Sequence, residues 1–164
     1  MKSDTIMTRI IPNGLVRIMT FALATVLLGA SMATAAESKV ITLTQVGCQF
    51  LESENGVDHK FKTSKADDCK AINAKTGEDR LAKSKVMKLR PGNYIFRVTN
   101  KNVPYGLGFW LRGKGLGRVT LPSVSGGGLN KGVTKDYKIT LKPGDYVYSC
   151  PLNPTPDYKL EVEG

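Results

Sequence analysis

The sulfur atoms and the single imidazole are the groups in this chain with the most distinctive chemistry. The 164 residues include three cysteines and one histidine. Thiolate and thioether sulfur bind soft ions such as Cu(I), and imidazole binds many transition metals. Cys150, His59 and Met87 are therefore candidate metal ligands, if the segment with His59 folds over Cys150. Each also has a simpler interpretation: Cys150 as a small buried apolar side chain, Met87 as a core residue alternating with Val86, and His59 as a solvated side chain.

Three cysteines in an oxidising compartment imply one disulfide and one remaining thiol. Cys48 and Cys69 are the predicted pair, because they bracket a polar segment that has little else to hold it. Closing a loop of that size stabilises the fold by roughly 3 kcal/mol. A bridge that contains Cys150 is the alternative. A redox-reactive Cys150 is a further hypothesis, although no C-x-x-C motif accompanies it.

Other catalytic patterns are missing from the sequence. With a single histidine, most acid–base designs are excluded, and no Ser/His/Asp set, metal-hydrolase motif or suitably spaced carboxylate pair occurs. The glycine-rich stretch 122–132 lacks the strand-then-helix context and the Lys-Ser/Thr ending of a phosphate-binding loop. We therefore expect no enzyme, and we interpret 122–132 as a flexible loop.

Residues 1–36 have the pattern of a secretory signal peptide. An apolar stretch, Ile18–Ala30, precedes a small-residue A-x-A site at residues 33–35, and basic residues precede and adjoin the apolar stretch: Lys2, Arg9 and Arg17. An uncleaved anchor is the alternative, but the apolar stretch is short for a membrane span of about 20 residues. We expect cleavage near residue 35 or 36, no membrane span afterwards, and a periplasmic or secreted protein with one domain at 37–164.

The predicted mature chain is strongly basic. Removing residues 1–36 takes three of the 24 basic and one of the 14 acidic residues, which leaves 21 against 13 and a net charge of +8. Such a charge outside the cytoplasm favours an acidic protein or redox partner, or an anionic membrane face, and argues against nucleic acid. The stretch 101–135 has six basic and no acidic residues. The predicted docking residues there are Tyr105, Arg112, Lys114 and Arg118, with an ordinary solvated rim as the alternative.

Most of residues 37–164 reads as short strands rich in β-branched and aromatic residues, separated by Gly, Pro and Asn turns. This spacing predicts an all-β sandwich or barrel. Alternation in the seventh strand places Tyr146, Tyr148 and Cys150 on one face, toward the core. The predicted strands are 39–45, 85–89, 93–100, 107–111, 118–121, 137–141, 145–150 and 158–162.

Two other local patterns stand out. The polar segment Ser53–Ser84 interrupts the strands and suggests a short helix over 64–75, with Ser64 as N-cap and Asp67 three residues later. The motif L-[RK]-P-G-x-Y occurs at 89–94 and again at 141–146. Its Pro-Gly pair predicts a tight turn, and the following tyrosine, Tyr94 or Tyr146, is expected to bury its ring and return its hydroxyl to nearby backbone.

The stretch "LKPGDYVYSCPLNPTPDYKLEV" resembles the C-terminal strand–loop–strand of the cupredoxins, the blue-copper fold. There a Pro-Gly turn and an aromatic strand lead to a copper-binding cysteine, here Cys150. "YIFRVTNKNVPYGLGFWL" resembles the other half of the copper site, where a strand ends in Val-x-Asn and a histidine follows. The resemblance spans 89–162 and implies a Greek-key β-sandwich, with the polar and partly helical segment inserted after the first strands. It also implies that Cys150 lies at the same end as Val103-Pro104-Tyr105.

The copper ligands themselves are not matched. The family has histidine where this chain has Tyr105 or its neighbours, and histidine then methionine after the cysteine, where "CPLNPTPDY" has neither. Blue copper needs two imidazoles and a thiolate in one plane. The resemblance thus implies a periplasmic cupredoxin-like protein for copper handling or electron transfer, with an altered or absent mononuclear centre and Cu(I) as the favoured metal. The alternative is a metal-free interaction module that docks an acidic protein.

Overall fold

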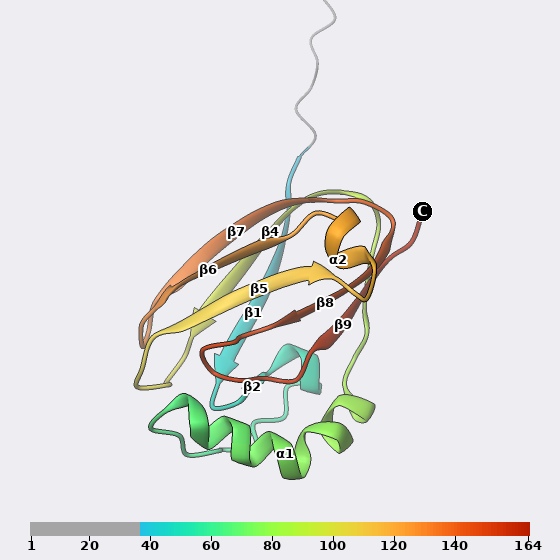
Figure 1. Cartoon of the computed structure of the whole chain (residues 1–164). Helices are drawn as coiled ribbons and strands as arrows, with labels where there is room; N and C mark the ends of the chain where they lie inside the picture. The colour runs from blue at the N-terminus through green and yellow to red at the C-terminus, as the bar shows by residue number, and fades with distance from the viewer. Residues whose placement is uncertain (1–36) are drawn as a thin grey trace, which may run out of the picture. The chain divides into compact units, whose positions relative to one another are not determined.

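A computed structural model describes residues 37–164, which form two packed, mixed β-sheets (Figure 1). The predicted signal peptide, 1–36, lies outside the described residues. The first sheet has the strand order β2 (Gln49–Phe50), β1 (Lys39–Val46), β4 (Gly92–Asn100) and β7 (Thr134–Leu141). The second has the order β3 (Met87–Leu89), β9 (Tyr158–Val162), β8 (Gly144–Ser149), β5 (Leu107–Gly113) and β6 (Val124–Leu129). β1 pairs parallel with β4 and β3 with β9, whereas the other pairs are antiparallel.

The core lies between the sheets and is rich in aromatic rings. Alternate residues of β4 and β7 are buried, as expected for strands with one face toward the core. Phe50 from β2 makes edge-to-face contacts with Phe109, Tyr148 and Tyr158 of the other sheet, at centroid distances of 5.6–6.1 Å. Such contacts join the two layers beyond the burial of apolar area. A β-sandwich is therefore confirmed.

Both Pro-Gly motifs fold as the sequence predicts. Tyr94 and Tyr146 are at most 3 % exposed. Their hydroxyls donate to the backbone oxygens of Arg90 and Lys142, each four residues upstream, at 2.8 and 2.9 Å. The last residue of each Pro-Gly pair opens a strand, and these two corners fix where β4 and β8 begin.

Two predictions in the stretch 118–132 are wrong. Residues 118–121 were expected as a strand, but the chain forms a single helical turn, α2 (Gly117–Thr120). The glycine-rich stretch was expected as a flexible loop, but it contains β6. Glycine is needed in this strand because a Cβ on Gly126 would lie 3.0 Å from the ring of Tyr137. Glycine at this position therefore allows the backbone of β6 to lie close to the Tyr137 ring, and it does not indicate a flexible segment.

The insertion after the first strands is more helical than predicted. A 3-10 turn, η1 (Glu52–Glu54), is followed by the 18-residue helix α1 (Ala66–Lys83). The N-cap of α1 is Lys65 and not Ser64. The acid that caps the helix is Asp68 and not Asp67, because its carboxylate accepts from the Ser64 hydroxyl and from the backbone nitrogens of Ser64 and Lys65. Neither helix between residues 37 and 164 is long and apolar enough to cross a membrane.

The predicted disulfide is confirmed. Cys48, in the turn between β1 and β2, is bonded to Cys69 of α1, with a Cα–Cα distance of 5.0 Å. Cys150 remains a free, buried thiol at the end of β8. The bridge holds α1 against one end of the sandwich, opposite the end with α2 (Figure 1).

Candidate functional site

Cys150 and the polar groups hydrogen-bonded around it form a buried cluster, the Cys150 pocket, at the end of the sandwich that α1 covers. The Cys150 side chain is fully buried. Its sulfur accepts hydrogen bonds from the backbone nitrogens of Gly108, at 3.3 Å, and of Asn153, at 3.2 Å. Its own backbone nitrogen donates to the hydroxyl of Thr155, so the loop after β8 folds back on the thiol. The environment therefore fixes the position of Cys150 and hides it from solvent.

Asn153 is the central residue of this pocket, and sequence reasoning missed it. Its side chain is fully buried and uses both ends of the amide. The amide nitrogen donates to the Val46 oxygen, while Oδ1 accepts from the Cys48 nitrogen and the Tyr105 hydroxyl, each at 3.1 Å. The Cys69 sulfur lies 3.1 Å from the same oxygen. One asparagine therefore joins the loop after Cys150, the disulfide and Tyr105.

Tyr105 reaches this pocket from the loop between β4 and β5. Asn100, at the end of β4, holds that loop: its side-chain nitrogen donates to the oxygens of Val103, Tyr105 and Leu129, and its Oδ1 accepts from the Val103 nitrogen. The loops carrying Tyr105 and Cys150 thus meet, as the predicted placement of Val103–Tyr105 requires. Asn100 is the asparagine of the Val-x-Asn pattern, so this signal was present in the sequence.

Burial shifts the pKa of both titratable groups of the pocket, Cys150 and Tyr105, upward. Burial raises the pKa of the Cys150 thiol above its ordinary value of 9.0, although backbone N–H groups of Gly108, Asn153 and Leu152 oppose the shift. Burial likewise raises the pKa of Tyr105. A metal would have to remove the proton from either group before binding. We therefore expect a thiol and a phenol here, and not a thiolate and a phenolate.

The residues around Cys150 do not fit a mononuclear copper centre. Two backbone nitrogens already donate to its sulfur, and the Tyr105–Asn153 hydrogen bond lies beside it. Within residues 37–164, no group of three or more His, Cys, Asp or Glu side chains is placed to hold a metal ion. Blue copper needs two imidazoles beside the thiolate. The polar groups around Cys150 instead form hydrogen bonds with one another.

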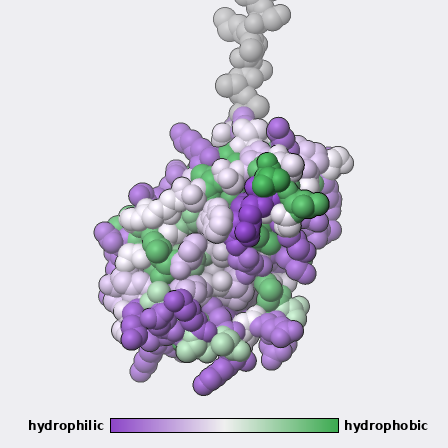
Figure 2. All heavy atoms as spheres, in the orientation of Figure 1, coloured by the Kyte–Doolittle hydropathy of each residue, from purple (hydrophilic) through white to green (hydrophobic). Residues whose placement is uncertain are grey.

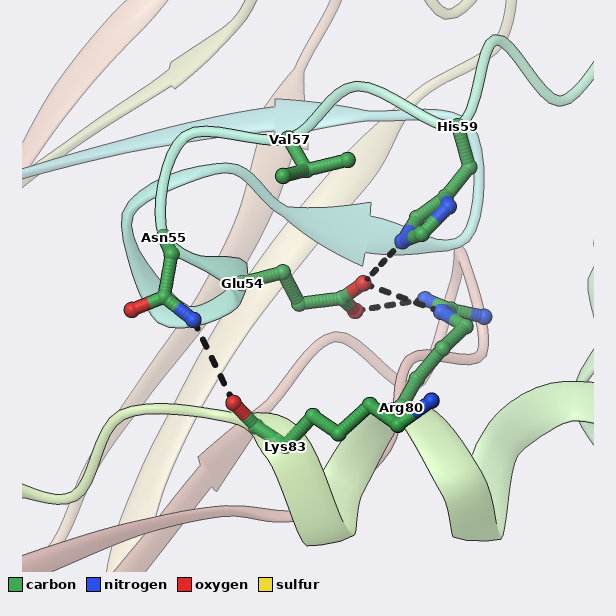
Figure 3. Close-up of a pocket in the computed structure, with 6 residues that line it drawn as sticks. All are labelled: Glu54, Asn55, Val57, His59, Arg80 and Lys83. Carbon is green, nitrogen blue, oxygen red and sulfur yellow. Dashed lines mark hydrogen bonds and ion pairs between the residues drawn. The ribbon is translucent and has the colours of Figure 1, made fainter.

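The other two candidate ligands lie in separate places. His59 lines a cavity of about 220 Å³ with Glu54 and Arg80 (Figure 3). Met87 lines a different cavity, of about 190 Å³, with Ile41 and neighbouring residues. In the described part of the chain, Cys150 lines neither cavity. The structure thus does not bring the three predicted ligands together.

The surroundings of His59 form a clamp between α1 and the sandwich. Arg80 donates from Nε and Nη2 to the two carboxylate oxygens of Glu54, at 3.0 and 2.7 Å. His59 Nε2 lies 2.7 Å from Oε2 of the same carboxylate, and the Tyr158 hydroxyl donates to Oε1. Burial by itself raises the pKa of Glu54, but hydrogen bonds from Arg80, Tyr158 and His59 outweigh it and hold that pKa below 4.5. All three nitrogens of the Arg80 guanidinium donate hydrogen bonds within the molecule, so the clamp has a structural role.

Arg112 does not belong to the exposed docking surface predicted for it. The side chain is 6 % exposed, and Nη2 donates to both carboxylate oxygens of Asp157 at 2.7 Å. Nη1 donates to the Ser149 hydroxyl, and the guanidinium lies 4.0 Å from the ring centroid of Trp110. Its charge is therefore neutralised within the molecule, and it holds the loop after β8 against β5.

Four of the other five basic residues of 101–135 form two surfaces and not one; the fifth, Lys135, donates to the Gly127 oxygen. Lys114 and Arg118 follow β5 and are exposed near α2, whereas Lys101 and Lys131 are exposed near Cys150. The two loops at the Cys150 end are neighbours, because the Gly132 nitrogen donates to the Asn100 oxygen at 2.7 Å. Seven residues of β5 separate the two ends, which is about 20 Å. Tyr105 belongs to the Cys150 end.

Comparison with protein-family models finds no family that matches this chain, and comparison with curated proteins finds no match. The likeness to cupredoxins therefore stands on the sequence patterns quoted above.

Proposed function

We propose that this protein is a metal-free binding module on a cupredoxin-like, Greek-key sandwich, in which side chains of the chain itself fill the place of a copper centre. The single observation that supports it is the Tyr105–Asn153–Cys150 cluster. A phenol lies on the loop where the resemblance implies one histidine, and an asparagine lies on the loop where it implies another. Both side chains are hydrogen-bonded to each other, next to a sulfur that already accepts two hydrogen bonds.

Copper binding tests the first half of this proposal. Mature protein mixed with Cu(II) is expected to show no intense thiolate-to-copper absorption at about 600 nm. The variant Tyr105→His/Asn153→His supplies two imidazoles beside Cys150, whose thiol Cu(II) would deprotonate on binding, and it is expected to gain that band. The same variant with Cys150→Ser is the matched control and is expected to lose it.

Two results would count against the proposal. A blue wild-type protein would mean that the cluster opens and finds further ligands. A folded double-histidine variant without the band would mean that Tyr105 and Asn153 do not occupy cupredoxin ligand positions. Cu(I) bound by the wild type, and lost in Cys150→Ser, would favour the copper-handling hypothesis instead.

The binding partner in this proposal is an acidic protein that docks at the Cys150 end. Exposed Lys101 and Lys131 lie on adjoining loops there, and Leu152, on the loop after Cys150, is 49 % exposed. Charge at the rim of an interface mainly speeds association and weakens with salt. We therefore expect Lys101→Glu/Lys131→Glu to slow association with this acidic partner at low salt. Lys114→Glu/Arg118→Glu, at the other end, is the control; equal slowing by both variants would contradict this placement.

A further inference from the structure

The helical turn α2 and its N-cap residue, Leu116, carry the two most exposed large apolar side chains in the described residues. Leu116 is 90 % exposed and Val119 is 86 % exposed. Figure 2 shows a hydrophobic patch, bordered by hydrophilic residues, over the position of α2 in Figure 1. Single exposed apolar residues are common, but two neighbouring aliphatic side chains that are almost fully exposed form a candidate binding surface.

The sequence places these two side chains together and directs them outward. They are three residues apart on one helical turn, a spacing that puts side chains on the same face. The turn is anchored from below: the Leu121 nitrogen donates to the Gly117 oxygen, and the Leu121 side chain packs over Gly144. A Cβ on Gly113 would overlap the Gly117 oxygen, so glycine there lets the turn fold closely onto β5. The result is a firmly seated, convex apolar tip.

Cations without an ion pair lie at the same end of the sandwich as the tip. Arg118 is on the turn, Lys114 lies between β5 and the turn, and Lys142 and Arg90 are on the adjoining Pro-Gly corners. These corners lie beside the turn, since the Lys114 nitrogen donates to the Asp145 oxygen at 2.8 Å and Gly92 is paired with Leu141 in the sheet. None of these four cations forms an ion pair within residues 37–164.

The acidic residues at this end do not cancel this charge. Glu161 and Glu163 pair with Lys88, at 3.4 and 3.0 Å. Two exposed acids at this end, Asp145 and Glu37, have no ion pair among the described residues, and exposed Lys39 lies two residues from Glu37, where β1 pairs with Tyr94. The surface around Leu116 and Val119 is therefore net positive.

We propose that this end of the sandwich docks on an anionic lipid bilayer, with Leu116 and Val119 inserted among the lipid headgroups and acyl chains. Apolar side chains flanked by Lys and Arg are the pattern of interfacial membrane binding. A protein partner fits less well, because a convex tip of a few residues is small against the roughly 800 Å² per side of a specific protein interface. Leu and Val are also under-represented among the residues that dominate protein interfaces.

Vesicle binding of the chain from Glu37 to Gly164 tests this proposal, since that segment contains all nine strands and the whole core described here. The probes are vesicles of neutral phosphatidylcholine and vesicles with a third of phosphatidylglycerol. We expect sedimentation with the anionic vesicles, little with the neutral ones, and a decrease as salt rises.

Two variants of the tip separate its apolar from its charged contribution. Leu116→Ser/Val119→Ser is expected to lower the partition coefficient by about tenfold or more, with an unchanged melting temperature because both side chains are exposed. Lys114→Gln/Arg118→Gln is expected to lower it by about fivefold for each cation removed. Lys101→Gln/Lys131→Gln, at the Cys150 end, is the matched control and is expected to bind as the wild type does.

The proposal is wrong if the wild type fails to bind anionic vesicles at low salt. It is also wrong if the serine variant binds as tightly as the wild type, or if the control variant loses as much affinity as the tip variants. These outcomes are independent of copper binding and of the acidic protein partner, which concern the opposite end of the sandwich.

Discussion

The clamp between Glu54 and Arg80 allows a quantitative prediction about how the helical insertion is held. The substitution Arg80→Gln removes the guanidinium but keeps a polar side chain of moderate length. It leaves the Glu54 carboxylate, 4 % exposed, without its bidentate partner. Removing one partner of a buried ion pair costs about 3–5 kcal/mol of unfolding free energy, because the remaining charge stays buried. For a domain of this size, that corresponds to a fall in melting temperature of roughly 10–20 °C.

The pH dependence of this loss follows from the Glu54 pKa. In the wild type that pKa is held below 4.5, so its stabilising contribution is present above the unfolded value and is lost as pH falls through the folded one. Without Arg80, burial is the largest remaining influence on the Glu54 carboxylate, and burial raises its pKa. The variant then gains stability on protonation of Glu54. The difference in stability between wild type and variant is therefore expected to narrow as the pH falls from 7 toward 4.

Thermal and urea unfolding, followed by circular dichroism at several pH values, measure both effects. Arg97→Gln is the matched control, because Arg97 pairs with Asp136 in a similar bidentate geometry but with side chains 48 % and 34 % exposed. The stability lost in Arg97→Gln is expected to be much smaller than in Arg80→Gln, because solvent screens an exposed ion pair. If Arg80→Gln costs no more than Arg97→Gln, or if its cost does not change with pH, our account of the clamp is refuted.

Two further predictions concern the cysteines. Replacing Cys48 and Cys69 by serine removes a link between residues 21 apart and is expected to lower the unfolding free energy by roughly 3 kcal/mol; an unchanged urea midpoint would refute this. In the native protein without reductant, Cys150 is expected to resist alkylation at pH 7, because it is buried and its pKa is raised. One thiol, mapped to Cys150, should react after denaturation, and rapid reaction of the native protein would show that the pocket opens.

The sequence by itself determined the features that depend on neighbouring residues. Alternating apolar residues predicted seven of the strands, and both Pro-Gly-x-Tyr corners formed because the tyrosine bonds to backbone only four residues away. The disulfide followed from two cysteines that bracket a polar segment. The place of Cys150 at the end of a strand was also readable, since strand and loop patterns change there.

Tertiary structure alone decided the features that join distant parts of the chain. The Asn153 side chain bonds to the Cys48 backbone 105 residues away, Arg112 pairs with Asp157 across 45 residues, and Arg80 with Glu54 across 26. The sequence does not show whether a basic side chain is solvated or is buried against a carboxylate. Only the packing of β5 between β8 and β6 turned Arg112 inward and divided the other cations between two ends. For this reason the charge of the protein was predictable, but the surfaces that present it were not.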